Sequence, residues 1–85
     1  METKLVGEVT HYFTNISVGV VKLFDTLKVG DEILIEGATT DFTQKVESMQ
    51  IDRKDVQEAG KGDSIGLKVK ERVRPGDQVY KILSK

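Results

Sequence analysis

The sequence predicts a small all-β domain whose strands close into a barrel. Three Gly-Asp pairs, Gly30-Asp31, Gly62-Asp63 and Gly76-Asp77, are each followed at once by a run of β-forming residues. Glycine supplies the positive φ that tight turns need and aspartate can bond the backbone just beyond it, so these pairs indicate turns that lead into strands. Apolar residues between the turns recur with a period of two, and no amphipathic helix is long enough to cover an open sheet. A closed barrel is favoured over a sandwich because it leaves no strand edge.

The clearest strand lies in residues 65–73, where apolar and polar residues alternate. The apolar positions that share one parity are Ile65, Leu67, Val69 and Val73. Leu5, Gly7 and Val9 repeat the pattern near the start of the chain, and residues 33–35 form a short apolar run. These segments are expected to be strands with one buried face.

Two segments, residues 16–23 and 42–51, change the parity of their apolar positions midway. A β-bulge in each would explain the change, and for the first segment burial on both faces explains it equally well. Residues 52–59 are expected to form a short strand or turn rather than a helix. Arg74-Pro75-Gly76-Asp77 predicts a type II turn, because proline presets the first corner and glycine fits the second.

Length and composition limit the class of protein. The 85 residues are expected to form one domain, residues 1–85. The chain has no cysteine and one histidine, which excludes disulfides and the common zinc frameworks. No long apolar run follows the N-terminus, so we expect no membrane anchor and a cytoplasmic location. The net charge is -1, yet residues 68–85 hold six Lys or Arg against two Asp or Glu.

No motif for catalysis is present, and we expect a protein that is not an enzyme and binds no cofactor or metal. The chain lacks a phosphate loop and a G-x-G-x-x-G cradle, so no nucleotide cofactor is expected. His11 is the only imidazole, and beside Tyr12 and Phe13 it is interpreted as structural. The carboxylates show no hydrolase or calcium-loop spacing.

Two sets of residues are candidates for binding. Lys68, Lys70, Arg72 and Arg74 would line one strand face about 7 Å apart, where they could bind the phosphates of RNA. The alternative is a strand face kept soluble by charge. Tyr12, Phe13 and Phe24, if exposed, would instead anchor a protein partner or a second copy of the chain.

Five segments in order resemble the second, β-barrel domain of the elongation factor Tu superfamily of translation GTPases. They are residues 5–9, 27–33, 45–49, 59–67 and 73–79. The resemblance implies a closed six-stranded Greek-key barrel, which in those GTPases holds aminoacyl-tRNA or contacts ribosomal components. The nucleotide domain is absent, and the family's early glycine-rich stretch retains only Gly19 here. GTP hydrolysis is therefore excluded.

The resemblance leaves two functions open. The first is a stand-alone translation-factor-like module that binds RNA, a ribonucleoprotein or a ribosomal component through the basic strand face. The alternative is a protein-interaction or oligomerising accessory module, since a similar barrel looks to be appended to collagenase-like peptidases. No membrane partner is expected in either case.

Overall fold

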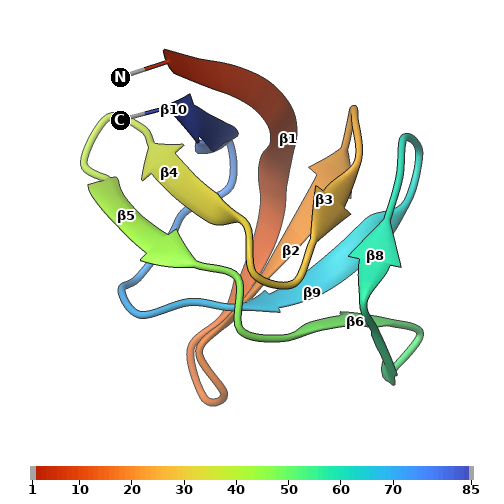
Figure 1. Cartoon of the computed structure of the whole chain (residues 1–85). Helices are drawn as coiled ribbons and strands as arrows, with labels where there is room; N and C mark the ends of the chain where they lie inside the picture. Colours follow the sequence, from red (N-terminus) through yellow and green to blue (C-terminus); the bar gives the residue numbers. More distant parts are fainter. Residues whose placement is uncertain (1, 85) are drawn as a thin grey trace.

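A computed structural model describes residues 2–84, which form β-strands joined by turns and contain no α-helix (Figure 1). The strands are β1 (Glu2–Phe13), β2 (Val18–Leu23), β3 (Leu27–Lys28), β4 (Glu32–Glu36), β5 (Asp41–Lys45), β6 (Met49–Ile51), β7 (Lys54–Val56), β8 (Glu58–Ala59), β9 (Ser64–Lys68) and β10 (Gln78–Ser84). The prediction of an all-β chain is confirmed. The segment 52–59 contributes to β7 and β8, as expected for a short strand or turn.

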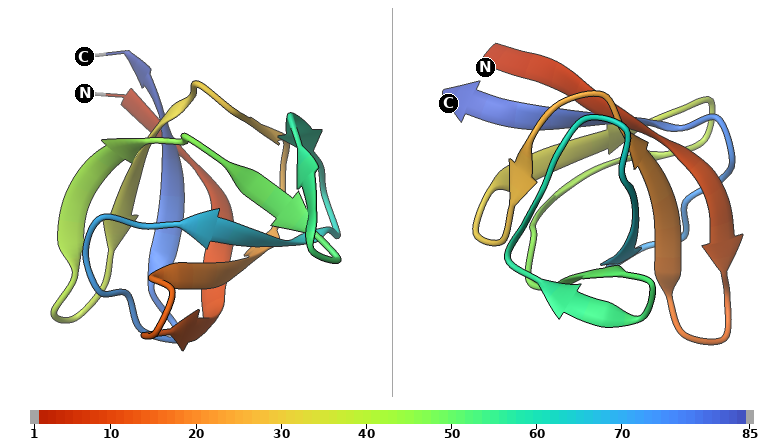
Figure 2. Two further views of the ribbon diagram at one scale, coloured as in Figure 1. Left: turned by 90° about the horizontal axis from the view of Figure 1, so that it is seen from below. Right: turned by 90° about the vertical axis from the view of Figure 1, so that its right-hand side faces the viewer.

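Eight strands form one antiparallel sheet in the order β5-β4-β10-β1-β2-β9-β6-β7, and β3 pairs with β8 in a second, two-stranded sheet. The large sheet curves around a common core (Figure 2). The long β1 pairs with β10 along one edge and with β2 along the other, so it joins the two halves of the sheet. The strands β5 and β7 end the order and do not pair with each other. The expected closed six-stranded Greek-key barrel is therefore wrong in both its closure and its strand count.

One side chain bridges a place where the backbone ladder is missing. Gln44 of β5 is 6% exposed, and its amide lies against the chain just after β9. Its Nε2 donates to the Lys68 carbonyl at 2.9 Å, and its Oε1 accepts from the Lys70 N–H at 2.8 Å. The side chain thus satisfies backbone groups that a neighbouring strand would otherwise pair. This explains why β5 and β9 approach each other without forming a ladder.

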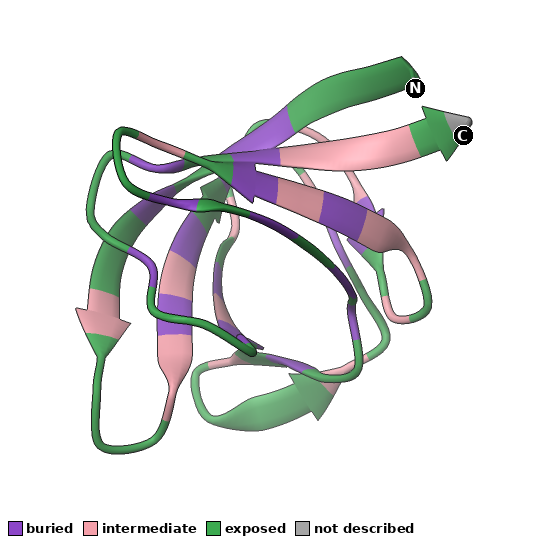
Figure 3. Cartoon of the chain, turned by 90° about the vertical axis from the view of Figure 1, so that its left-hand side faces the viewer, coloured by how far each residue is buried: buried purple, intermediate pink, exposed green. Residues whose placement is uncertain are grey.

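The core lies inside the curved sheet and contains the apolar residues of one strand face. Buried positions alternate along the strands (Figure 3). Ile65, Leu67, Val69 and Val73 are all buried, as their shared parity predicts. Leu5 is the exception. A register shift between Leu5 and Gly7 turns Val6 into the core and leaves Leu5 39% exposed.

The two expected bulges are absent from the segments that predicted them. The β2 strand pairs with β9 in continuous register, and the irregularity of the β1–β2 ladder lies in β1, between Val9 and His11. Burial on both faces holds only in part for residues 16–23, because Val18 and Val20 are half-buried on the outer side and Ile16 is 57% exposed. In residues 42–51 the parity changes because β5 ends at Lys45 and a short connection leads to β6.

The three Gly-Asp pairs close three turns of the same construction. Gly30, Gly62 and Gly76 have φ of 100, 91 and 96 degrees. In each turn the aspartate carboxylate accepts from the N–H three residues earlier, at 2.9, 2.9 and 2.8 Å. The aspartate N–H donates back to the carbonyl of that same residue. The type II turn at residues 74–77 is confirmed. The sequence predicts bonds to the backbone just beyond each aspartate, but each aspartate bonds backbone groups three residues earlier.

The two ends of the described chain lie side by side, because the first residues of β1 pair with the last residues of β10 (Figure 1). Residues 2–84 include no helix of the length and hydrophobicity that a membrane crossing requires.

Candidate protein-interaction surface

A groove runs over the outer face of the sheet along β9, and we call it the β9 groove. Its volume is about 390 Å³, at the lower end of the range for ligand pockets. One wall is apolar and consists of Phe13, Ile16, Val18 and Val20. The other wall belongs to the β6–β7 hairpin and consists of Gln50, Asp52 and Arg53. The groove therefore joins an apolar side to a polar, charged side.

Gly66 forms the floor of the β9 groove, between the two walls. In the ladders it lies opposite Val20 of β2 and opposite Gln50 of β6. A Cβ atom added to Gly66 would have ordinary van der Waals contact, 3.4 Å from Val18 Cγ1. Neither backbone conformation nor lack of space requires glycine at this position. The missing side chain instead leaves the floor open.

The β6–β7 hairpin places Arg53 at the groove through a strained turn. Asp52 and Arg53 occupy the tip with φ of 50 and 66 degrees. Such a pair of positive φ values is typical of a type I′ turn, in which Asn-Gly is favoured. Among the described residues, neither charged group has a hydrogen bond or an ion pair with another side chain. On the same wall, Gln50 Nε2 donates to Asp55 Oδ1 at 2.9 Å, which holds the Gln50 side chain in place.

The exposed apolar side chains nearest the groove belong to the β1–β2 hairpin. Phe13 and Ile16 are 47% and 57% exposed, and they also line a second hollow of about 310 Å³ at the hairpin tip. The His11 ring lies edge-on to the Phe13 ring, with 4.5 Å between centroids. Large apolar side chains held in the open beside a groove are typical of contact surfaces.

The three aromatic residues expected at an interface occupy different places. Phe13 lies on the β9 groove, Tyr12 is half-buried against the core, and Phe24 is 42% exposed beyond the far end of β2. They do not form one cluster in the described chain, since Phe13 and Phe24 stand at opposite ends of β2. Their role at an interface stays a prediction, with Phe13 the best placed.

The four basic residues do not share a strand face. The β9 strand ends at Lys68, and Lys70 and Arg72 lie in the loop that follows. The Gln44 amide takes the place of a ladder here and ends the regular spacing. All four side chains are exposed, and the Arg74 Nε donates to Thr39 Oγ1 at 2.9 Å. Lys68 and Lys70 border a shallow hollow of about 180 Å³.

Within residues 2–84 no three His, Cys, Asp or Glu side chains gather in a way that could hold a metal ion. The pKa of one carboxyl is perturbed. The Lys4 ammonium bonds to Asp25, and the Thr26 N–H donates to it, and both lower the pKa of Asp25 below its ordinary value. Because this carboxylate is exposed and paired on the surface, it has the features of a structural ion pair.

The fold matches that of a known class of domain. It is the fold of the C-terminal domain of a putative U32 peptidase from Geobacillus thermoleovorans, whose crystal structure superposes with a TM-score of 0.87. That match covers 93% of this chain and 92% of the other, at 22% sequence identity. The selenomethionine variant of the same domain gives a TM-score of 0.85.

Curated proteins are also similar to this chain in amino-acid sequence. The uncharacterized protease MJ0090 of Methanocaldococcus jannaschii is 45% identical over 76 residues, which cover 88% of this chain. A collagenase of Porphyromonas gingivalis is 40% identical over 78 residues, which cover 89% of this chain. The chain spans only 19% and 22% of the length of these two relatives. No family model matches the sequence.

These relatives overturn the resemblance to the elongation factor Tu superfamily. Both structures compared above are U32 peptidase C-terminal domains, and the curated relatives are a protease and collagenases. The resemblance rested largely on Gly-Asp turns, and the three turns share one local geometry that any compact β fold can use. The interpretation as a translation factor that binds RNA is therefore wrong. The alternative of an accessory module agrees with the relatives.

Most residues of the β9 groove were not predicted from the sequence. The signal was present in residues 16–23, where Val18 and Val20 have the parity opposite to the buried Val21 and Leu23. Their outward position could have been inferred from the two-face explanation. Gly66 and Arg53 could not have been found, because only the pairing of β9 with β2 brings Gly66 to Val20 and only the pairing of β6 with β9 brings Arg53 to the groove.

Proposed function

We propose that the chain is a non-catalytic accessory module of a collagenase-like peptidase and that it acts by contacting another polypeptide. The observation that carries the proposal is the identity of 40 to 45% with about a fifth of the length of a protease and a collagenase. A segment of that size and all-β fold, without an acid, base and metal constellation among the described residues, suits a supporting role.

The surface supports contact with a polypeptide rather than a small molecule. Phe13 and Ile16 are about half exposed, and they continue into the apolar wall of the β9 groove. Aromatic side chains of this kind supply much of the binding energy at protein interfaces. The groove is lined by residues of two paired strands, β2 and β9, which suits an extended chain.

The Porphyromonas gingivalis collagenase offers a test of this role. We would delete its matching segment, or replace it by this chain, and measure cleavage of collagen and of a short peptide. An accessory module predicts that deletion lowers collagen cleavage more than peptide cleavage and that the replacement restores it. The isolated chain should cleave neither substrate.

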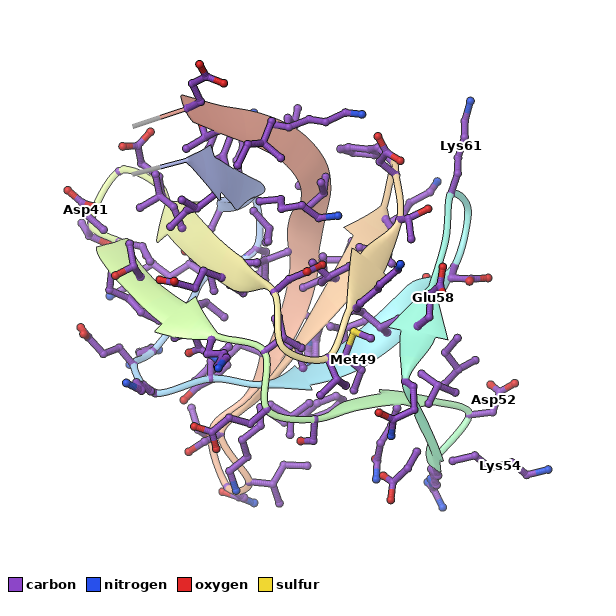
Figure 4. The ribbon with its side chains drawn as sticks, viewed as in Figure 1. Asp41, Met49, Asp52, Lys54, Glu58 and Lys61 are labelled. Carbon is purple, nitrogen blue, oxygen red and sulfur yellow. The ribbon has the colours of Figure 1, made fainter. Side chains whose placement is uncertain are left out.

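Two results would contradict the proposal. One is hydrolysis of either substrate by the isolated chain, which would make it catalytic. The other is a deletion that leaves both activities unchanged while the protein stays folded. The exposed apolar surface is tested by replacing the collagenase segment with this chain carrying Phe13→Ser and Ile16→Ser. The control is the same replacement with Lys61→Gln. Lys61 stands at the tip of the loop between β8 and β9, away from the β6–β7 hairpin (Figure 4).

A further inference from the structure

We propose that the β9 groove binds an extended acidic segment of another protein, in which one apolar side chain lies between two carboxylates, each two residues away. This inference rests on the proposed function, because it names the chemistry of the polypeptide that the module contacts. It follows from three features: an open floor beside an apolar wall, unpaired cations at the two ends of that floor, and Arg53 at one of those ends.

The open floor is the first feature. The outer face of β9 presents Ser64, Gly66 and Lys68, since the alternate residues Ile65 and Leu67 are buried in the core. Gly66 is the middle of the three and has neighbours on both sides. An apolar side chain of a partner can lie over Gly66 against Val18 and Val20, which are half-buried and would lose their remaining contact with water.

Cations at the two ends of the floor are the second feature. Lys22 lies opposite Ser64 at one end, and Lys68 lies opposite Val18 at the other. Both side chains are exposed on the outer face. The two ends are four residues apart, which in a strand is about 13 Å. An extended partner therefore reaches both cations with carboxylates four residues apart, and the residue midway between them lies on the same side of its chain.

Arg53 is the third feature. Gln50 pairs with Gly66, so the hairpin tip that follows Gln50 lies past the middle of the floor, toward Ser64. There Arg53 and Lys22 stand on the two sides of one end of the groove. Arg53 holds a positive φ that disfavours a side chain, and residues kept in such conformations concentrate at functional sites. Its guanidinium fits a carboxylate through two hydrogen bonds.

The charges near the groove favour an acidic ligand. Asp52 is the one acidic residue among those that line it. Glu8 lies opposite Lys22 in the β1–β2 ladder, yet the two make no ion pair in the described chain. Asp55 already accepts the Gln50 amide. Glu47 borders the same hollow as Lys68 and forms no ion pair with it. Against these acidic residues stand Arg53, which lines the groove, and Lys22 and Lys68, which lie at its ends; none of the three has an ion pair among the described residues. The cations are thus available to a partner.

Synthetic peptides test the inference directly. The probe is an acetylated and amidated peptide with the central sequence Glu-Ser-Leu-Ser-Glu between Gly-Ser ends. One control has Gln in place of both Glu, and a second has the same composition with Leu moved next to a Glu. Binding is followed by amide shifts of the whole chain labelled with nitrogen-15. We expect shifts at Val18, Val20 and Gly66, and affinity at least about fivefold higher for the probe than for either control.

Variants of the chain locate the site. Gly66→Leu fills the floor and should abolish binding. If that variant fails to fold, Gly66→Ala takes its place and should weaken binding. Arg53→Gln should weaken binding about threefold, Arg53→Lys should weaken it less, and Asp52→Asn should strengthen it. Lys61→Gln should leave the affinity unchanged.

Equal affinity for the probe and its Gln control would overturn the inference, as would shifts confined to residues 68–74. Tight binding by folded Gly66→Leu would do the same. None of these results bears on the collagenase deletion, so the proposed function can survive a failure of this inference. If the collagenase role fails while the peptides bind as expected, the groove is a binding site of a module with another host.

Discussion

The three Gly-Asp turns and the β6–β7 turn solve the same problem of reversing the chain, and they do so with different residues. The Gly-Asp turns place glycine at φ near 100 degrees and lock the turn with a carboxylate. The β6–β7 turn places Asp52 and Arg53 at positive φ, with no glycine. Backbone strain is small in the Gly-Asp turns, because glycine adopts positive φ easily, and larger in the β6–β7 turn. The difference separates turns that serve the fold from one that presents a side chain to the β9 groove.

The largest expected effect comes from removing the carboxylate of the most buried turn aspartate. Asp77 is 4% exposed and accepts the Arg74 N–H at 2.8 Å. Asp77→Ala leaves that N–H without a partner and should destabilise the protein by about 2 kcal/mol. Thermal unfolding should then occur about 10 °C lower.

Asp77→Asn is the matched control, because its amide oxygen can still accept the same bond. It should lose less than half as much stability. Asp31→Ala should also lose less, since Asp31 is only half-buried. If Asp77→Asn were as unstable as Asp77→Ala, the charge rather than the hydrogen bond would hold the turn.

A smaller effect is expected from glycine itself. Gly76 has a φ of 96 degrees, and a Cβ added there meets nothing within 4 Å. Gly76→Ala should therefore cost about 1 kcal/mol through backbone strain alone. Gly60 also has open space around it but no positive φ, so Gly60→Ala should be neutral or slightly stabilising. Urea unfolding measures both, and equal losses would show that the positive φ of Gly76 does not set the cost of the added side chain.

The β6–β7 turn should respond in the opposite direction. Arg53→Gly relieves the positive φ and should stabilise the protein by about 0.5 kcal/mol. The control is Lys54→Gly in β7, where φ is not positive and glycine should destabilise by about the same amount. Urea unfolding of the two variants gives the comparison. A loss of stability in Arg53→Gly would mean that the Arg53 side chain supports the fold rather than a ligand.

The sequence predicted well those features that depend on neighbouring residues. The Gly-Asp turns, the type II turn at residues 74–77 and the buried parity of Ile65, Leu67 and Val69 are all local. Closure of the barrel and the basic strand face depended on how distant strands meet. Gln44, which bridges β5 to the segment after β9, reaches residues 24 and 26 positions away. Nothing local distinguishes it from any other polar residue in a strand.

The candidate site was harder to predict for the same reason. Phe13 was a candidate only on the condition that it is exposed, and the sequence could not decide this; the structure leaves Phe13 47% exposed at the end of β1. The β9 groove is made by residues from β2, β6 and β9, and their meeting is set by ladder register rather than by sequence spacing. A glycine that only leaves space open, such as Gly66, looks like any strand glycine until its neighbours are known.

The smallest expected effect concerns an aspartate outside the turns. Asp25 is exposed, and its bonds with Lys4 and the Thr26 N–H lower its pKa from the ordinary value of 3.8. Because its pKa is lower in the folded state than in the unfolded one, the carboxylate stabilises the fold above the unfolded pKa. That contribution disappears as the pH falls through the folded pKa.

Asp25→Asn should therefore unfold at a slightly lower temperature than the wild type at neutral pH, and the difference should vanish in strong acid. The effect should be smaller than that of Asp77→Ala, because water and salt screen an exposed pair and leave a buried hydrogen bond unscreened. Thermal unfolding of both proteins across the acid range measures it, with added salt as a second variable. A difference that grows in acid or resists salt would contradict this expectation, because the amide oxygen of the variant can still accept from the Thr26 N–H and only the charge is lost.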